Sequence, residues 1–370
     1  MGGGLAGLQL AHAFCTDGSF SSKSIAIIEP RELNTNDKRW SYWEKGIGKW
    51  DHLVSSKWPC GRFVSQYGDL KLKMGGYIYK SVQSIDFYNH LTDFLKDFPN
   101  VKFINDKVTE VNTDIYTIDT DSSSFKADYI FDSRPSSQFG RSVASGTSNL
   151  IHQHFKGWVI KTEAAVFNTD EFTMMDFTAK FKDTCSFIYI LPYSKNEALI
   201  EMTFFTPKIN FDGEYDELLK MYISKTLKVD FFEIIEVEKG DIPMTDFPFQ
   251  NYNKEHYLKI GTGGGWVKGS TGYSFKRAEK FVEQIIRNLK QGRPLDSNLY
   301  KSRFMWYDKI FLRVLKNYNH LGEKVFFKLY SRNPHTLIFK FLDEETNPGE
   351  ELKILGSLFS LQFIKSIFKN

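Results

Sequence analysis

A glycine-rich loop near the start of the chain has the spacing of a phosphate-binding turn. Gly2, Gly4 and Gly7 fit the pattern G-x-G-x-x-G, and a helix-like apolar run over residues 8–14 follows. The strand-like Ile25–Ile28 is followed by Glu29, which lies 22 residues after Gly7. Glycines let the backbone approach a pyrophosphate, and a helix N-terminus adds partial positive charge. A carboxylate at this position binds ribose hydroxyls and repels a 2′-phosphate. The pattern predicts a dinucleotide site that prefers FAD or NAD to NADP.

The strand that normally leads into such a loop is missing, because only Met1 precedes Gly2. A lone G-x-G-x-x-G is a weak signal without that strand, and an ordinary glycine-rich start is the alternative. If the fold is right, the parallel sheet lacks a central strand. We expect either a late start codon or truncated gene, or a chain with a damaged cofactor site.

Glu201 stands inside the otherwise apolar segment 198–205, which alternates like a strand. It would share one face of a sheet with Leu199 and Thr203. Burial raises the pKa of a carboxyl group toward the range that suits a general acid. The alternative is a glutamate on the solvated face of a two-faced strand.

A second glycine cluster occupies residues 261–272, with six glycines in 12 residues, and precedes a helix-like segment from about Phe275. Its bare backbone N–H groups could hold another part of the same dinucleotide. We assign Gly264, Gly265, Thr271 and Gly272 to cofactor binding on this basis, with a purely structural loop as the alternative.

Three other charged residues are candidates for cofactor binding. Arg39 stands beside Trp40 in a tryptophan-rich segment, residues 31–60, that looks like a loop. Arginine and tryptophan together can cover a flavin or stabilise a cation, and a structural aromatic loop is the alternative. Asp132 and Arg134 follow an apolar strand, at the end where α/β sheets place ligand groups.

The composition is that of a globular protein. The 370 residues carry a formal charge of +3, which does not favour nucleic acid as a partner. The three cysteines are scattered without metal-ligand spacing, so we expect reduced thiols in a cytoplasmic protein and no metal. Aromatic residues reach 16%, which fits a large apolar cavity or an AT-rich genome.

The C-terminal quarter mixes apolar and basic residues. Residues 311–330 and the tail Glu351–Asn370 fit lysine-bearing amphipathic helices. Such helices either lie in a membrane interface or pack against a core. No stretch of 18 apolar residues could span a bilayer.

Taken in order along the chain, these motifs resemble the bacterial lycopene cyclases, a group of FAD-linked flavoproteins. The resemblance runs almost end to end. Its more specific pieces are Phe131-Asp132-Ser133-Arg134-Pro135, Phe155-Lys156-Gly157-Trp158, Gly264-Gly265-Trp266 and Ser270-Thr271-Gly272-Tyr273. One departure is Gly269, which stands where we expect proline in relatives.

The resemblance implies cyclisation of the ends of lycopene to β-rings, giving β-carotene through γ-carotene without net redox change. It implies reduced FAD as cofactor and NAD(P)H as reductant. Glu201 matches the family's essential acidic position, so Glu201, or the reduced flavin beside it, would protonate the terminal double bond. The insoluble polyene would arrive from a bilayer, which favours a protein bound peripherally to the inner face of the cell membrane.

The predicted fold class is α/β, with a Rossmann-like FAD-binding domain interleaved with a sheet-rich substrate domain. We expect the FAD-binding domain with inserted strands over residues 1–150 and the substrate domain over 151–250. Residues 251–290 return to the FAD-binding domain, and 291–370 form a helical, membrane-contacting region. Within the substrate domain, residues 155–160, 164–167, 186–191 and 198–205 are predicted strands.

Two rival functions share these features. A redox flavoenzyme, such as a hydroxylase or an isoprenoid reductase, would also use the glycine loop and Glu29. A truncated, non-catalytic remnant would bind carotenoid at most. The sequence does not decide between cyclisation at one end or both.

Overall fold

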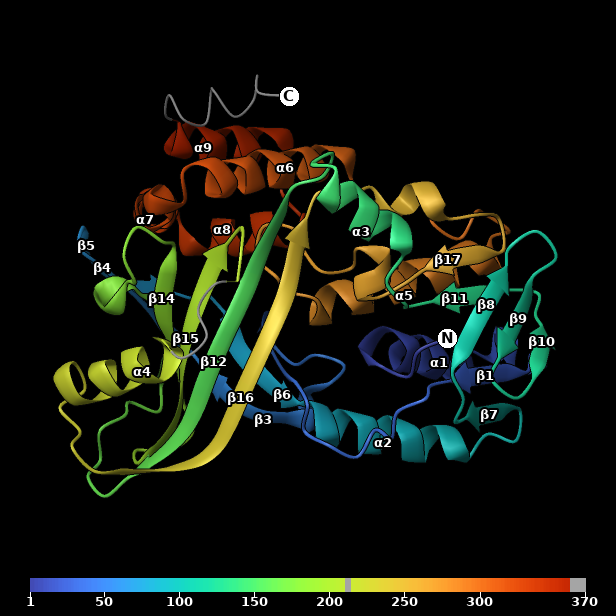
Figure 1. Cartoon of the computed structure of the whole chain (residues 1–370), viewed down its shortest axis with the longest axis horizontal. Coiled ribbons are helices and arrows are strands. Elements are labelled where there is room, and N and C mark those ends of the chain that lie inside the picture. The colour runs from blue at the N-terminus through green and yellow to red at the C-terminus, as the bar shows by residue number, and fades with distance from the viewer. Residues whose placement is uncertain (210–213, 360–370) are drawn as a thin grey trace.

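The structure is a computed structural model, and it describes residues 1–209 and 214–359. Figure 1 shows two parts side by side: an α/β part that contains the N-terminus, and a large sheet with helices on both faces. The chain passes between these parts several times, as the prediction of interleaved segments requires.

The α/β part is built from two pairs of parallel strands and the helices beside them. Strand β1 (Ile25–Ile28) pairs with β7 (Val101–Ile104), and β11 (Ile130–Asp132) pairs with β17 (Tyr257–Lys259). Helix α1 (Leu5–Thr16) packs between α2 (Ser84–Lys96) and α5 (Phe275–Lys290). Apolar side chains from these helices, such as Leu8, Leu91 and Ile285, are fully buried.

No strand precedes α1 within the described residues, and the first two residues lie between the strand pairs. The Gly2 N–H donates to the Ile28 carbonyl on one side (2.8 Å). On the other side the Met1 amino group donates to the Phe131 carbonyl (2.7 Å), and the Ser133 N–H donates to the Met1 carbonyl (3.1 Å). Met1 and Gly2 therefore occupy the position of a central strand.

Two smaller sheets flank this part. One contains β8 (Val108–Asn112), β9 (Thr117–Thr120) and β10 (Ser124–Lys126), and helix α3 (Ser137–Ala144) follows β11. The other has the order β2 (Arg39–Lys45), β6 (Tyr77–Gln83), β3 (Val54–Trp58). The prediction of a tryptophan-rich loop over 31–60 was therefore wrong. Trp43 and Trp58 are buried on these strands, because aromatic side chains favour the pleated, half-buried surface of a sheet.

The large sheet has seven strands, in the order β16 (Phe232–Thr245), β12 (Leu150–Thr162), β15 (Glu197–Thr206), β14 (Ser186–Pro192), β13 (Glu171–Asp176), β4 (Cys60–Ser65), β5 (Gly68–Lys73). Three of the four predicted strands of this region are present. Residues 164–167 are not a strand. They form a bend and irregular backbone, in which the Val166 and Phe167 N–H groups donate to the Lys195 carbonyl.

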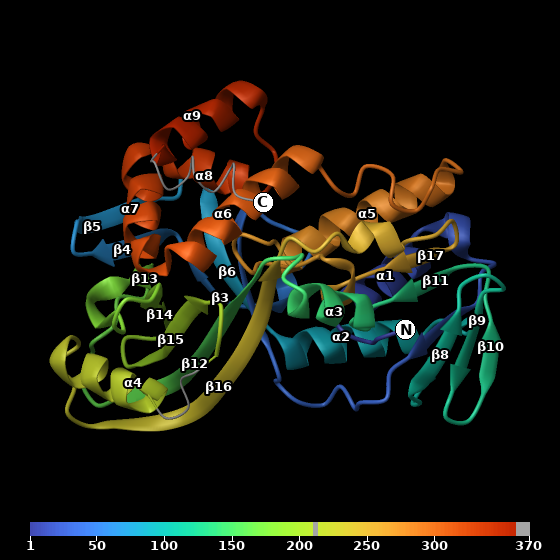
Figure 2. The same cartoon turned by 45° about the horizontal axis from the view of Figure 1, so that its top comes forward.

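Helices cover both faces of the large sheet (Figure 2). Helix α4 (Glu214–Lys225) packs on one face through Tyr215, Leu219 and Ile223. The other face is covered by α6 (Ser302–Asn317), α7 (Gly322–Arg332), α8 (His335–Leu342) and α9 (Pro348–Leu358). Short 3-10 helices occupy Gly18–Phe20, Asp51–Leu53, Phe177–Ala179, Phe249–Tyr252, Thr262–Gly264 and Asn319–Leu321.

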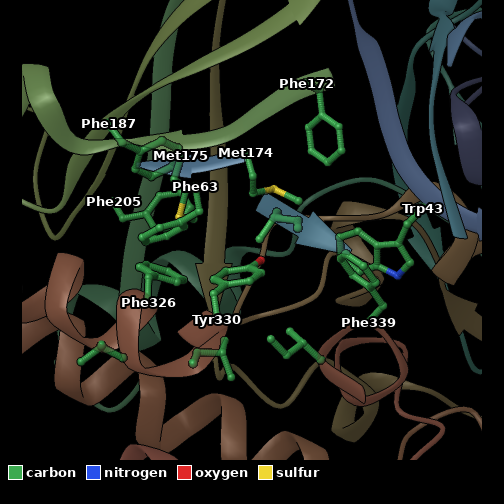
Figure 3. Close-up of a cluster of buried hydrophobic side chains, with 14 of the residues drawn as sticks. Trp43, Phe63, Phe172, Met174, Met175, Phe187, Phe205, Phe326, Tyr330 and Phe339 are labelled. Carbon is green, nitrogen blue, oxygen red and sulfur yellow. The ribbon is translucent and has the colours of Figure 1, made fainter. Parts of the chain in front are cut away.

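The largest hydrophobic cluster lies between the sheet and the C-terminal helices (Figure 3). Phe187 and Phe205 of the sheet face Phe326 of α7, and the Phe205 and Phe326 ring centroids are 6.0 Å apart. None of the helices in residues 1–209 and 214–359 is long and apolar enough to cross a membrane. Part of the predicted amphipathic tail, residues 360–370, lies outside the described residues.

Candidate functional site

Glu201 is buried in the middle of β15, with 7% of its surface exposed. Strand β15 is covered on both faces, so its alternate residues enter different environments. Ile200, Met202 and Phe204 pack against α4. Glu201 therefore points to the opposite face, where the Thr203 hydroxyl donates to its Oε1 atom (2.5 Å). The alternative of a solvent-facing glutamate is excluded.

The Glu201 side chain lines a cavity of about 940 Å³ between the large sheet and the C-terminal helices. This volume is at the upper end of the range for small-molecule sites. The walls are mainly aromatic and aliphatic, and they include Trp43, Phe155, Met174, Phe187, Leu199, Phe205, Phe311 and Phe326. The cavity suits a long apolar ligand, with one carboxyl group in its wall.

A second carboxyl group, that of Glu238 on β16, contacts Glu201. Both residues are in register with Gly157 on β12, which lies between their strands. The two side chains lie close enough for the charge of Glu238 to act on Glu201. Arg39, from β2, approaches the Oε2 atom of Glu238 (3.4 Å) and the Oε2 atom of Glu236 (3.3 Å).

Burial raises the pKa of Glu201 well above its usual range, and the negative charge of Glu238 raises it further. The Thr203 hydrogen bond and the Arg39 charge act in the opposite direction. Because burial dominates, the pKa of Glu201 moves toward the range that suits a general acid.

Three tyrosines in the cavity wall form a hydrogen-bonded chain that sequence reasoning missed. The Tyr79 hydroxyl lies 2.8 Å from the Tyr189 hydroxyl and 2.7 Å from the Tyr273 hydroxyl. Burial raises the pKa of all three phenols well above their usual range, so they stay neutral. They come from three separate segments, and only Tyr273 lies in a motif that the sequence singled out.

The glycine loop has the geometry of an anion-binding turn. Gly4 precedes α1, whose N-terminus has no side-chain cap and no acidic residue in its first turn. A Cβ atom at Gly4 would meet nothing within 4 Å, so open space lies beside these free N–H groups. At Gly7, by contrast, a Cβ atom would lie 2.0 Å from the Gly2 carbonyl oxygen. The chain therefore needs glycine at position 7 for packing, and Gly4 leaves space for a ligand.

Glu29 lies beside this loop, as its spacing predicted. Its Oε2 atom accepts from the Gly3 N–H (2.8 Å), and its Oε1 atom accepts from Arg31 Nε (2.9 Å). Burial raises the pKa of Glu29, but these hydrogen bonds outweigh burial and lower the pKa overall. An ionised carboxylate next to the glycine turn fits the ribose of a dinucleotide.

The second glycine cluster divides into a packed half and a half that lines the cavity. A Cβ atom at Gly264 would lie 2.3 Å from the Lys259 carbonyl oxygen, and one at Gly265 would lie 2.5 Å from the Phe249 ring. Thr271 and Gly272 line the large cavity instead. Lys268, between the halves, pairs with Asp308 (2.7 Å) and Glu344 (3.1 Å) and anchors the loop to the C-terminal helices.

Asp132 and Arg134 bind each other at the carboxyl end of β11. Asp132 Oδ1 accepts from Arg134 Nε (3.0 Å), and its Oδ2 atom accepts from the Tyr257 hydroxyl (2.9 Å). Burial raises the pKa of Asp132, but Arg134 and Lys259 lower it to about 2. The two residues tie β11 to β17, and neither lines the large cavity. Their role in cofactor binding stays a prediction.

Apart from Gly264 and Gly265, which pack against Lys259 and Phe249, the sequence-predicted residues fall into two groups. Arg39, Glu201, Thr271 and Gly272 surround one cavity. Gly2, Gly4, Gly7, Glu29, Asp132 and Arg134 gather around the start of α1 and the strand ends next to it. Sequence reasoning missed Glu238 altogether. The isolated glycine within strand β12 was a signal for it, because such a glycine often marks a close approach of other groups.

Comparison with known proteins identifies the family of this chain. The model of the family described as "Lycopene cyclase protein" matches residues 1–367. The chain belongs to the lycopene cyclase family. No curated protein sequence matches it.

Solved structures share the fold of this lycopene cyclase family member. A geranylgeranyl bacteriochlorophyll reductase-like protein from Thermoplasma acidophilum has 14% identity and a TM-score of 0.60, covering 98% of this chain and 96% of its own. A flavoprotein/dehydrogenase from Cytophaga hutchinsonii has 12% identity and a TM-score of 0.60, covering 99% and 96%. A flavin-dependent brominase has 12% identity and a TM-score of 0.55, covering 96% and 92%. The fold is thus that of flavoproteins, and the predicted fold class is confirmed.

Proposed function

We propose that this protein is a lycopene β-cyclase, which converts the ends of lycopene to β-rings without net transfer of electrons. The observation that carries the proposal is Glu201, a buried carboxyl group of raised pKa in the wall of a large apolar cavity. Protonation of an isolated carbon–carbon double bond needs a positioned acid and a site that excludes water. Membership of the lycopene cyclase family supports the choice of substrate.

In this proposal, Glu201 donates its proton to the terminal double bond of the polyene. The resulting cation closes the ring, and loss of a proton from the ring completes the isomerisation. Electron-rich ring faces of the cavity, such as those of Trp43, Tyr79 and Phe187, stabilise the cation. The neutral tyrosine chain adds polarity without a charge that would trap the cation.

We propose FAD as the cofactor, with NAD(P)H as its reductant. The open N-terminus of α1, Gly4 and the ionised Glu29 would hold the dinucleotide, and Arg39, Thr271 and Gly272 would face its ring system from the cavity. The reduced flavin would supply negative charge beside the developing cation.

We also propose that the polyene reaches the cavity from a membrane. Three cavity-lining residues of the C-terminal region are strongly exposed: Trp306, Leu352 and Phe359, at 47%, 71% and 67%. Exposed lysines, Lys316 and Lys353, lie on the same helices. An apolar rim with nearby positive charge fits the surface of an anionic bilayer.

Pigment analysis tests the cyclase proposal. The wild-type chain, Glu201→Gln and the control Glu197→Gln are each expressed in a bacterial host that accumulates lycopene. Glu197 lies on the same strand but does not line the cavity. We expect γ-carotene and β-carotene from the wild type and the control, and unchanged lycopene from Glu201→Gln. A product whose mass differs from that of lycopene would instead point to a reductase or a hydroxylase, and unchanged lycopene in all three would reject the proposal.

Flotation with anionic vesicles tests the membrane proposal. Replacement of Leu352 by Gln removes about 1.5 kcal/mol or more of apolar burial, so we expect at least a tenfold weaker association. The control is Ile47→Gln, which changes an exposed apolar residue (92% exposed) outside the cavity wall. Equal losses in both variants would contradict a specific role for the cavity rim.

A further inference from the structure

Gly157 has no side chain in the middle of the large sheet, and two glutamate side chains converge above it. Glu201 and Glu238 lie on strands on either side of β12, each in register with Gly157. Residues two strands apart are separated by about 9.5 Å along the hydrogen-bonding direction, so a side chain on the middle strand normally stands between them. Here the middle residue has no side chain.

The fit over Gly157 is close. A Cβ atom there would lie 3.1 Å from Glu238 Cγ, 3.3 Å from Glu201 Cβ and 2.8 Å from Leu199 Cδ1. The side chains of Leu199 and the two glutamates therefore already occupy the space above the glycine, and the two glutamates are near enough to act on each other electrostatically. Two carboxyl groups at such close range bind each other only when one of them carries a proton.

The surroundings of the two carboxyl groups are unequal. Glu238 and its neighbour Glu236 both pair with Arg39, while Glu201 lies deeper and accepts from the Thr203 hydroxyl. The phenols of Tyr189, Tyr193 and Tyr273 are also within electrostatic reach of Glu201, and burial keeps them neutral. The arrangement favours the proton on Glu201 and the negative charge on Glu238, next to Arg39.

We propose that Glu201 and Glu238 act as one acid pair, which holds a single proton across Gly157, and that Glu238 takes back the proton released in the reaction. The catalytic half of this inference rests on the proposed cyclase function. The O–H bond of Glu201 breaks and a C–H bond forms at the end of the polyene. After ring closure, a ring C–H bond breaks, its electron pair becomes the ring double bond, and its proton passes to the Glu238 carboxylate. Transfer of that proton from Glu238 restores Glu201, so atoms and electrons balance without a further reactant.

Infrared titration of the purified protein without substrate tests the pair. The carboxylic acid C=O absorption is followed from about pH 5 to about pH 9 in the wild type, Glu201→Gln, Glu238→Gln and Glu236→Gln. We expect an acid band at neutral pH that disappears in Glu201→Gln. In Glu238→Gln, Glu201 should lose its proton at a pH at least one unit lower, because the neighbouring negative charge is gone. Glu236→Gln is the matched control, since it removes a carboxylate that binds the same arginine, and its titration should follow the wild type. An unchanged titration in Glu238→Gln would overturn the pair.

The pigment assay separates failure of the pair from failure of the cyclase function. If the titration behaves as expected but the wild type leaves lycopene unchanged, the acid pair stands and the proposed function fails. If the wild type cyclises lycopene and Glu238→Gln cyclises it equally well, the return of the proton to Glu238 is refuted.

Discussion

The raised pKa of Glu201 makes a quantitative prediction about stability, and Glu201→Gln tests it. Glutamine keeps the shape of the side chain and can still accept from Thr203, but it cannot ionise. Burial raises the pKa of Glu201 in the folded chain, whereas the unfolded chain releases the proton near pH 4.3. The folded state then binds more protons than the unfolded state. The free energy of unfolding of the wild type therefore falls as the pH rises above about 4.3, by up to about 1.4 kcal/mol per pH unit.

Glu201→Gln has no proton to release at this position, so its free energy of unfolding relative to that of the wild type should rise with pH. Between pH 5 and pH 7 the gain amounts to about 2.5 kcal/mol, as long as the folded pKa stays above 7. With a urea m-value of about 3 kcal/mol per molar, the midpoint difference between the two proteins changes by about 0.8 M. The effect of replacing the side chain itself is the same at both pH values and cancels.

Urea unfolding at pH 5, 6 and 7, followed by far-UV circular dichroism, measures this difference. Glu197→Gln serves as the control, because its partly exposed carboxyl group on the same strand should leave the two pH dependences parallel. Parallel curves for Glu201→Gln and the wild type would mean that Glu201 ionises as readily in the folded chain as in the unfolded one. In that case the argument that Glu201 is a protonated acid at neutral pH would fail.

Three further predictions concern the elements around the site. Lys268→Met leaves Asp308 and Glu344 as buried charges without their lysine, so we expect a loss of about 3–5 kcal/mol in the free energy of unfolding. The control Lys280→Met breaks a more exposed pair with Glu345 and should cost less than about 1 kcal/mol. Equal losses in the two variants would contradict the role of burial. Asp132→Asn should destabilise the chain by about 2 kcal/mol at pH 7, because Arg134 and Lys259 hold the pKa of Asp132 in the folded chain at about 2. The stabilisation belongs to the ionised form, so the difference in free energy of unfolding between variant and wild type should close between about pH 4 and pH 2. A difference that stays constant with pH would refute this account. Gly4→Ala has space for its methyl group and should leave the midpoint of urea unfolding unchanged. Absorbance of the purified variant should nevertheless show less bound flavin per chain than in the wild type. Undiminished flavin would mean that the loop does not contact the cofactor.

Local sequence patterns located several of the helices, many of the strands and the residues that belong to single motifs, but they missed α3 and α4. The glycine spacing and Glu29 predicted one turn and one carboxylate beside it, and the structure places both together. The pattern failed over Arg39–Lys45 and Val54–Trp58, which form the strands β2 and β3 instead of a loop. It also failed at 164–167, because the long-range hydrogen bonds to Lys195 decide the conformation there.

The acidic site shows the same division between sequence and tertiary structure. Glu201 could be identified from the sequence because a carboxyl group within an apolar strand is unusual, and the periodicity of a strand fixes which neighbours share its face. Its partner Glu238 is remote in the sequence, and the contact exists only because β12 separates β15 from β16 and carries glycine at position 157. The order of strands in a sheet is determined by packing of the whole chain. Hydrophobic periodicity reports only the local backbone, so the meeting of the two glutamates, the pairing of Arg39 with Glu238 and the tyrosine chain became visible only in the tertiary structure.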